Sequence, residues 1–185
     1  SDRVIQFLPI THIFERGWSY LAFSEGCHII INTNPHDIQQ SMRETHPTCM
    51  SSVPRFWEKV YQAVLDKIDR SSVAKQRLFR HALEVGRRYN IDCKSRCKRP
   101  SPLLAMEYKL FDKMILRLVR KQIGLENAHL FPTAGATVSP AVERFVHSVG
   151  INMIVGYGLT ESLATVSCDR EDMPFTIGSV GRPIN

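Results

Sequence analysis

The sequence has no hydrophobic run long enough to cross a membrane. Its apolar stretches are all far shorter than the roughly 18 residues that a spanning helix needs, and its first residues lack the basic-then-apolar layout of a signal peptide. The composition, 43% hydrophobic and 23% charged, is ordinary for a soluble globular protein. By length the chain is one domain or a large piece of something bigger, and strand-like residues that begin already at Val4 suggest a piece cut from a longer chain.

Cysteine is scarce, and the number is odd. Three of the five cysteines, Cys27, Cys49 and Cys168, lie in apolar, strand-like runs, which suits small buried hydrophobic residues. Cys93 and Cys97 lie in a basic stretch with no second pair to complete a zinc site. We therefore predict reduced thiols in a cytosolic protein, and no metal at Cys93 and Cys97.

Several well-known signatures are also missing. No G-x-x-x-x-G-K segment occurs, which excludes a P-loop NTPase for this chain. Glu161 stands where the third glycine of a dinucleotide fingerprint would follow Gly156 and Gly158. The seven histidines and the two serines Ser139 and Ser162 show no triad in sequence, which leaves their grouping in space open.

The positive charge is concentrated in the middle of the chain. Residues 54–122 hold 18 Lys and Arg against 7 Asp and Glu, so this segment carries +11 and the remainder carries −5. Such a segment could meet nucleic acid, anionic lipid or a phosphorylated ligand. Its charges are spread around helical faces, however, which favours a solvated helical surface.

The pattern of elements predicts an α/β fold. Strand-like runs at 4–8, 27–31 and 48–53 alternate with helical patterns near 13–22 and 35–45. This β-α-β-α-β order with short joins is typical of a parallel sheet with right-handed crossovers. The run at 27–31 is so uniformly apolar that we expect it to be buried on both faces, with His28 as a satisfied core residue.

Three amphipathic helices then interrupt the alternation. They begin near Pro54, Ser72 and Pro102 and are predicted to lie across one face or edge of the sheet, with a basic loop at 94–100. The alternation resumes with a strand at 129–134, a helix at 139–148 and a strand at 152–155, which we expect to break at Gly156. A further strand-like run follows at 164–168.

Three loops are expected at the carboxyl ends of strands, where ligands of open parallel sheets bind, and the last two, which follow consecutive strands, are expected to lie side by side. They are Pro9–His12, Gly135–Thr137 and Gly156–Glu161. The glycines of the second and third loops allow the main chain to approach a flat ligand. Tyr157 offers a ring to stack on, Thr160 a donor for phosphate and Glu161 a hard oxygen ligand for magnesium. His12 either begins a helix or belongs to the site.

Five segments resemble the motifs of one enzyme family, in that family's order. Three resemble motifs of the adenylate-forming (AMP-binding) enzymes: Ala134-Gly135-Ala136-Thr137-Val138-Ser139-Pro140, Tyr157-Gly158-Leu159-Thr160-Glu161 and Gly178-Ser179-Val180-Gly181-Arg182-Pro183. Two are similar to motifs of long-chain fatty acyl-CoA synthetases: Leu8-Pro9-Ile10-Thr11-His12-Ile13-Phe14-Glu15-Arg16, and the stretch from Pro47 to Tyr61 with Val53-Pro54-Arg55. The matches run from residue 8 to residue 183.

The resemblance implies a three-layer, parallel-sheet portion of the adenylate-forming N-terminal domain, covering residues 1–185, with a three-helix insertion at about 54–122. It also implies a two-step ligase. A fatty carboxylate attacks the α-phosphate of ATP, giving an acyl-adenylate and pyrophosphate, and the thiol of coenzyme A then displaces AMP. The expected ligands are therefore ATP, Mg²⁺, the fatty acid and coenzyme A.

The resemblance also implies roles for single residues. Adenine would be lined by Gly135, Ala136 and Thr137, with Tyr157 stacked on it. The α-phosphate would accept a hydrogen bond from Thr160, and Glu161 would hold Mg²⁺. His12 would lie near the carboxylate. The remaining nucleotide-binding positions would be Gly156, Gly158 and Leu159.

The family's phosphate loop, ribose-binding aspartate and C-terminal domain have no counterpart in these 185 residues. We therefore expect the chain alone not to complete adenylation. Two alternatives remain: an adenylate-forming enzyme for another carboxylic acid, or a basic helical module that binds nucleic acid or membrane through residues 54–122. Under the leading interpretation no nucleic acid is expected, and the basic segment is compatible with peripheral membrane contact.

Overall fold

The computed structural model describes residues 1–170 and 173–184. Its strands are β1 (Arg3–Gln6), β2 (His28–Ile31), β3 (Phe131–Thr133), β4 (Met153–Leu159), β5 (Ala164–Cys168) and β6 (Arg182–Pro183). Its α-helices are α1 (Ile13–Ser24), α2 (Ile38–Thr45), α3 (Pro54–Asp69), α4 (Val73–Arg87), α5 (Pro102–Phe111), α6 (Arg117–Ile123) and α7 (Pro140–Ser148). Short 3₁₀ or π segments are η1 (Pro35–Asp37), η2 (Arg88–Cys93), η3 (Lys94–Arg96) and η4 (Asp112–Leu116).

The strands confirm the predicted α/β class. β1 pairs in parallel with β2, and β3 pairs in parallel with β4. Residues 49–52 lie between the two pairs and form isolated parallel bridges, Cys49 with Val4 and Leu130, and Ser52 with Thr133. The predicted third strand therefore occupies its expected place but does not form a full ladder. β4, β5 and β6 continue as an antiparallel ribbon.

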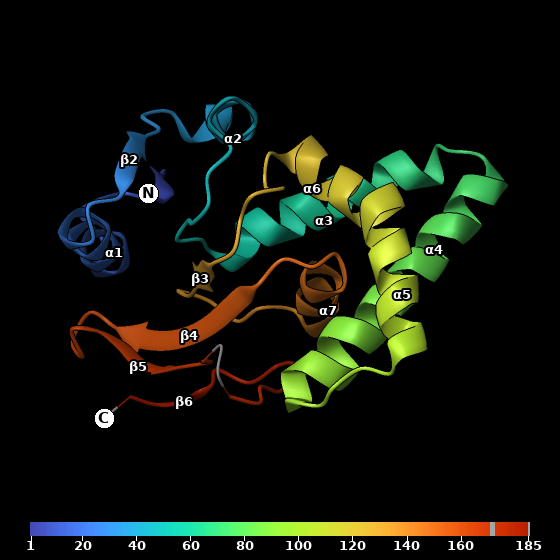
Figure 1. Cartoon of the computed structure of the whole chain (residues 1–185). Coiled ribbons are helices and arrows are strands. Elements are labelled where there is room, and N and C mark those ends of the chain that lie inside the picture. Colours follow the sequence, from blue (N-terminus) through green and yellow to red (C-terminus); the bar gives the residue numbers. More distant parts are fainter. Residues whose placement is uncertain (171–172, 185) are drawn as a thin grey trace.

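Helix starts follow the sequence closely. Pro54, Pro102 and Pro140 each stand in the first turn of a helix, where the missing N–H is no loss. Ser101 caps α5 by accepting a hydrogen bond from the backbone N–H of Leu104. Figure 1 shows α4 and α5 on the side of the molecule away from α1, with α7 between them and the β4–β5–β6 ribbon. The three predicted helices are thus confirmed, with η4 joining α5 to α6.

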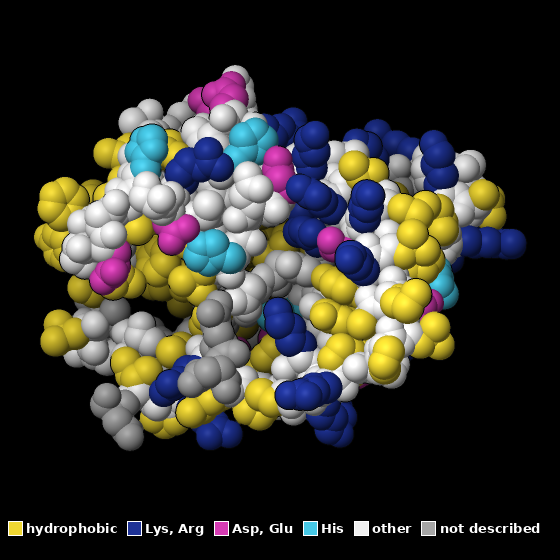
Figure 2. All heavy atoms as spheres, in the orientation of Figure 1, with side chains coloured by type: hydrophobic (Ala, Val, Ile, Leu, Met, Phe, Trp, Pro, Cys, Tyr) yellow, Lys and Arg dark blue, Asp and Glu magenta, His cyan; other side chains and the backbone are white. Residues whose placement is uncertain are grey.

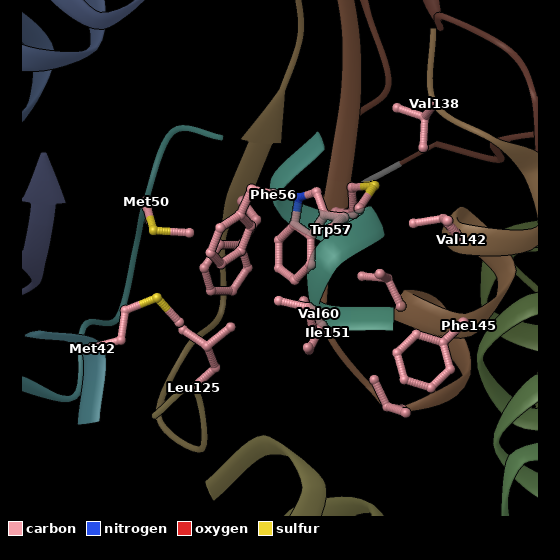
Figure 3. Close-up of a cluster of buried hydrophobic side chains, with 14 of the residues drawn as sticks. Met42, Met50, Phe56, Trp57, Val60, Leu125, Val138, Val142, Phe145 and Ile151 are labelled. Atoms are coloured by element: carbon pink, nitrogen blue, oxygen red, sulfur yellow. The ribbon is translucent and has the colours of Figure 1, made fainter. Parts of the chain in front are cut away.

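The main core lies between the parallel strands and helices α3 and α7. Trp57 of α3 is fully buried and meets the ring of Phe131 edge to face, with centroids 5.4 Å apart. Figure 3 shows Trp57 with Met50 and Leu125 to one side and Val142 and Phe145 to the other. The core thereby joins segments from both ends of the chain.

Helix α4 packs directly against the end of α7. A Cβ added at Gly86 would lie 2.0 Å from the backbone oxygen of Ser148, so only glycine allows this approach. Of the described helices, none is long and apolar enough to span a bilayer.

Four sequence-based expectations are wrong in detail. β2 is not buried on both faces: Ile31 is 72% exposed and His28 is exposed, because β1 is the only described strand that pairs with β2. Cys49 is buried, but Cys27 and Cys168 are only partly so. The expected basic loop at 94–100 is in part helical, since η2 and η3 continue the turn of α4 through residue 96. β4 does not break at Gly156.

Candidate functional site

The Gly135–Thr137 loop and the end of β4 lie at the same edge of the sheet. Thr133, the last residue of β3, is the parallel partner of Val155, so the loop after β3 begins beside Val155, while β4 continues to Leu159. Gly135 has φ of +94°, which favours glycine, and all of Gly135, Ala136 and Thr137 are exposed. The structure thus places the Gly135–Thr137 loop after a strand that neighbours β4, and a shared site with residues 156–161 stays a prediction.

A buried hydrogen-bond group anchors the start of this edge. The indole N–H of Trp57 lies 2.9 Å from Ser52 Oγ and 3.1 Å from Thr133 Oγ1, and the two hydroxyls lie 2.8 Å apart. All three side chains are buried. Because buried polar groups with satisfied hydrogen bonds fix local geometry, the Gly135–Thr137 loop leaves from a rigid base.

The predicted glycine loop at 156–161 is largely strand. Gly156 and Tyr157 pair with Cys168 and Ser167 of β5, and the register shifts between Tyr157 and Gly158. Side chains along a strand point alternately to its two faces. Met153 and Val155 of β4 are buried, and Tyr157 follows them on the same face. Tyr157 is 45% exposed. An aromatic ring with this much exposed surface is suited to stacking.

Thr160 and Glu161 lie in the turn that joins β4 to β5. The turn is closed by Ser162, whose backbone N–H donates to the Leu159 carbonyl and whose hydroxyl lies 3.0 Å from the Leu159 backbone nitrogen. The side chains of Thr160 and Glu161 are both exposed. The turn therefore presents a hydroxyl and a carboxylate to solvent without using either to hold its own shape.

His12 is the N-cap of α1. Its Nδ1 accepts from the backbone N–H of Phe14 at 3.5 Å, so the structure confirms the helix-start role, and a role in the site stays a prediction. α1 packs against β5, and Figure 1 shows α1 near the β4–β5 hairpin. Figure 2 shows a hollow on this side of the molecule, between α1 and the β4–β5 hairpin.

A buried carboxylate that the sequence reasoning did not single out connects α1 to the sheet. Glu15 is 1% exposed, and its Oε2 accepts a hydrogen bond from the hydroxyl of Ser51. Burial raises the pKa of Glu15 above its usual range, while the bond from Ser51 opposes that rise. The available signal was position, since Glu15 shares a helix face with Ser19 and Ala22, which are also buried.

A second group of ionisable side chains lies toward the other end of β4. Glu143 and His147 of α7 and Asp169 after β5 are all buried, and Oε2 of Glu143 accepts from the backbone N–H of Gly178 at 2.8 Å. Burial raises the pKa of Glu143 to about 7 and that of Asp169 to about 6. Burial also lowers the pKa of His147 to about 4, with Lys94 contributing.

A cavity of about 480 Å³ adjoins this group. Its lining includes Lys94, His147, Met153, Asp169 and Phe175, and therefore lies at the amino end of β4. The exposed hairpin tip lies at the opposite end of that strand. The cavity is thus separate from the predicted nucleotide edge.

Replacing Glu143 by glutamine should change how stability depends on pH. The pKa of the Glu143 carboxyl is about 7 in the folded protein, against 4.5 for an unperturbed glutamate. The folded state therefore holds the proton more tightly than the unfolded state, and stability is lost as the pH rises from 4.5 to about 7. Glutamine keeps an acceptor for Gly178 and never ionises. The free energy of unfolding of Glu143→Gln relative to the wild type should therefore be larger at pH 8 than at pH 5, by up to about 3 kcal/mol.

The measurement is denaturant unfolding at the two pH values. Glu25→Gln is the matched control, because Glu25 is exposed and its replacement should shift both curves equally. Asp169 acts with the same sign as Glu143 and His147 with the opposite sign, so the comparison is made between variants at each pH. An equal difference at pH 5 and pH 8 would contradict the assignment.

The fold is an α/β architecture in which a glycine loop follows β3 and an exposed tyrosine lies on β4, the neighbouring strand. The model of the AMP-binding enzyme family matches residues 1–185. The chain therefore belongs to the AMP-binding enzyme family.

Curated relatives point to one branch. Long-chain-fatty-acid–CoA ligase FadD15 of Mycobacterium bovis is 27% identical over 100% of this chain, and long-chain-fatty-acid–CoA ligase 3 of Saccharomyces cerevisiae is 28% identical over 98%. The chain spans 30% and 25% of the lengths of these relatives. The matches therefore cover nearly all of this chain but less than a third of each relative.

Solved structures confirm the fold. A benzoate CoA ligase from Burkholderia xenovorans superposes with a TM-score of 0.58 over 100% of this chain and 27% of its own, at 18% identity. O-succinylbenzoate coenzyme A synthetase from Bacillus subtilis, solved in complex with ATP and magnesium ion, gives a TM-score of 0.55 at 13% identity, over 99% of this chain and 27% of its own. These likenesses show the architecture alone.

Proposed function

We propose that this chain is part of an ATP-dependent long-chain fatty acid–CoA ligase in the cytoplasm. A carboxylate oxygen of the fatty acid attacks the α-phosphorus of ATP and pyrophosphate leaves; the thiol sulfur of coenzyme A then attacks the acyl carbon and AMP leaves. The observation that carries the proposal is the identity to curated long-chain ligases along 98–100% of the chain. The five ordered motifs support the same branch.

The geometry at the carboxyl edge suits the nucleotide part of this reaction. Gly135, Ala136 and Thr137 would lie against adenine, with the exposed ring of Tyr157 stacked on it. Thr160 would donate to the α-phosphate. The exposed carboxylate of Glu161 fits Mg²⁺, which prefers carboxylate oxygens and would neutralise phosphate charge when bound.

The test is a panel of carboxylic acids given to the intact enzyme that contains this chain, with ATP, Mg²⁺ and coenzyme A. We expect pyrophosphate release and acyl-CoA formation with long-chain fatty acids and little of either with acetate, benzoate or amino acids. A preference for one of the other acids would replace the long-chain assignment within the same family. The 185-residue chain by itself should release no pyrophosphate, and release that depends on a fatty acid would contradict this.

We also propose that the helical insertion contacts membranes. Five large apolar side chains on α5, η4 and α6, here called the outer stripe, are between 51% and 76% exposed: Leu103, Met106, Leu110, Met114 and Leu118. Their spacings of three and four residues place them on one helix face. The exposed cations Lys109, Lys113 and Arg117 run beside them at the same spacing, and Figure 2 shows Lys and Arg alternating with hydrophobic side chains over these helices.

An apolar face flanked by cations is typical of a helix that lies in the interface of an anionic bilayer. Each cation near such a surface contributes about 1 kcal/mol, and buried apolar area adds to this. A ligase that took fatty acids from a membrane would gain from such contact. The occupant we propose for the outer stripe is therefore an anionic lipid surface.

Charges placed within the outer stripe should prevent this contact. Leu110→Glu with Met114→Glu should lower the partition coefficient onto vesicles of phosphatidylcholine and phosphatidylglycerol, measured by sedimentation, by at least about tenfold. A loss of about 1.4 kcal/mol of binding free energy already corresponds to that factor. Val73→Glu, an exposed apolar position on α4, is the control and should bind as the wild type does. Unchanged binding of the double variant, or no binding of the wild type, would contradict the proposed membrane contact through the outer stripe.

A further inference from the structure

Three possible metal ligands meet at the amino edge of the parallel strands. Asp2 immediately precedes β1, His129 lies just before β3, and Cys49 lies on the segment between them. The register explains the meeting, since Cys49 bridges to Val4 on one side and Leu130 on the other. We call these three residues the amino-edge cluster. It lies at the opposite end of the strands from Gly135.

The ligand atoms are close enough to share one ion. Cys49 Sγ lies 3.5 Å from His129 Nε2, which lies 2.9 Å from Asp2 Oδ1, and one donor atom from each residue lies within 4.8 Å of the others. Within residues 1–170 and 173–184, this is the one group of three such side chains found. Cys49 is buried, while the side chains of His129 and Asp2 are about half exposed. The cluster is therefore enclosed by protein at Cys49 and open to solvent at His129 and Asp2.

The spacing matches a tetrahedral zinc site. With Zn–S near 2.3 Å and Zn–N near 2.05 Å, tetrahedral angles put sulfur and nitrogen about 3.6 Å apart, close to the distance between Cys49 and His129. The same geometry puts nitrogen and carboxylate oxygen about 3.4 Å apart, so Asp2 would move outward by about half an ångström. Asp2 is at the surface and has room for that movement.

A hydroxyl holds the carboxylate in place from behind. Thr48 Oγ1 donates to Asp2 Oδ1 at 2.8 Å, and the backbone N–H of Arg3 donates to the same hydroxyl oxygen at 2.9 Å. Partners of this kind orient the ligands of metal sites. Thiolate, imidazole and carboxylate together favour zinc over magnesium or calcium, which prefer oxygen ligands alone.

We propose that the amino-edge cluster binds one Zn²⁺ through Cys49 Sγ, His129 Nε2 and a carboxylate oxygen of Asp2, with water as the fourth ligand. Binding releases the thiol proton of Cys49 to solvent. The ion joins β1, the 48–52 segment and β3 at the edge where no predicted substrate group lies. Its role is to stabilise the sheet, and the thiol at position 49 is a ligand rather than only a core side chain.

Cobalt substitution tests the site directly. Metal-free protein titrated with Co²⁺ should develop a thiolate-to-cobalt charge-transfer band in the near ultraviolet, saturating at one equivalent, and Zn²⁺ should abolish that band. His129→Gln removes a half-exposed ligand with little risk to folding and should weaken Co²⁺ binding at least about tenfold, the smallest loss seen even for residues that only support ligands. Cys49→Ala should remove the charge-transfer band altogether.

Cys97→Ser is the matched control, because Cys97 is exposed in the basic stretch and should leave the titration unchanged. Circular dichroism of each metal-free variant shows whether it has folded. The proposal fails if the wild type gives no charge-transfer band, if the band survives in Cys49→Ala, or if His129→Gln binds Co²⁺ as tightly as the wild type. None of these readouts uses ligase activity, so the outcome is independent of the proposed function.

Discussion

In the intact enzyme that contains this chain, Glu161→Ala should lower fatty-acid-dependent release of pyrophosphate by about a hundredfold or more, while the unfolding curve stays unchanged. The loss follows from the proposed role of Glu161 as a magnesium ligand. An ion that neutralises charge at the reacting phosphate, and fixed groups around it, account for effects of this size in other enzymes. The substitution should lower kcat with Mg-ATP rather than only raise KM.

The fold should tolerate this change because Glu161 does not hold the hairpin together. The turn is closed by backbone bonds from Ser162 to Leu159 and from Leu163 to Thr160, and the Glu161 side chain is exposed. Exposed substitutions away from caps and cores usually change stability by less than about 0.5 kcal/mol. Activity and stability are therefore expected to separate cleanly in this variant.

Two further variants sharpen the interpretation. Glu161→Gln keeps the length of the side chain and an amide oxygen but loses the charge, so it should retain more activity than alanine and much less than the wild type. Glu25→Ala removes an exposed carboxylate at the C-cap of α1 and should behave as the wild type. Near-normal kcat in well-folded Glu161→Ala would remove Glu161 from the metal site.

Local signals in the sequence predicted most of the fold. Proline and serine at helix starts located α3, α5 and α7, and apolar periodicity gave the helical insertion. The ordered motifs predicted the importance of the Gly135 loop, which follows β3, and of Tyr157, which lies on the neighbouring strand β4. These features depend on neighbours within a few residues, or on a family pattern, and both are visible in one sequence.

Features that depend on what packs beside a segment could not be predicted. The apolar run of β2 indicated burial on both faces, whereas Ile31 is exposed because its neighbours are set by the tertiary arrangement. Gly156 and Gly158 suggested a loop, but pairing with β5 overrides the low strand propensity of glycine. The meeting of Asp2, Cys49 and His129 depends on register between segments far apart in sequence.

Trp57→Ala should have the largest effect on stability. Trp57 is fully buried, contacts Phe56 and Phe131 edge to face, and donates to the hydroxyls of Ser52 and Thr133. Replacing a buried aromatic side chain by alanine costs about 3–5 kcal/mol, and whole domains are stable by only about 5–15 kcal/mol. Denaturant unfolding should show that loss in the midpoint, with a partly unfolded population under mild conditions.

Trp57→Phe separates packing from hydrogen bonding. Phenylalanine keeps an aromatic ring in the core but leaves Ser52 and Thr133 without the indole donor. A lost hydrogen bond to buried groups costs about 1–3 kcal/mol, so this variant should fall between the wild type and Trp57→Ala. Because Thr133 ends β3, and the Gly135 loop follows, a folded Trp57→Phe should also weaken ATP binding although Trp57 lies away from the exposed edge. Equal nucleotide affinity in the two proteins would show that the buried group supports the sheet without shaping the loop.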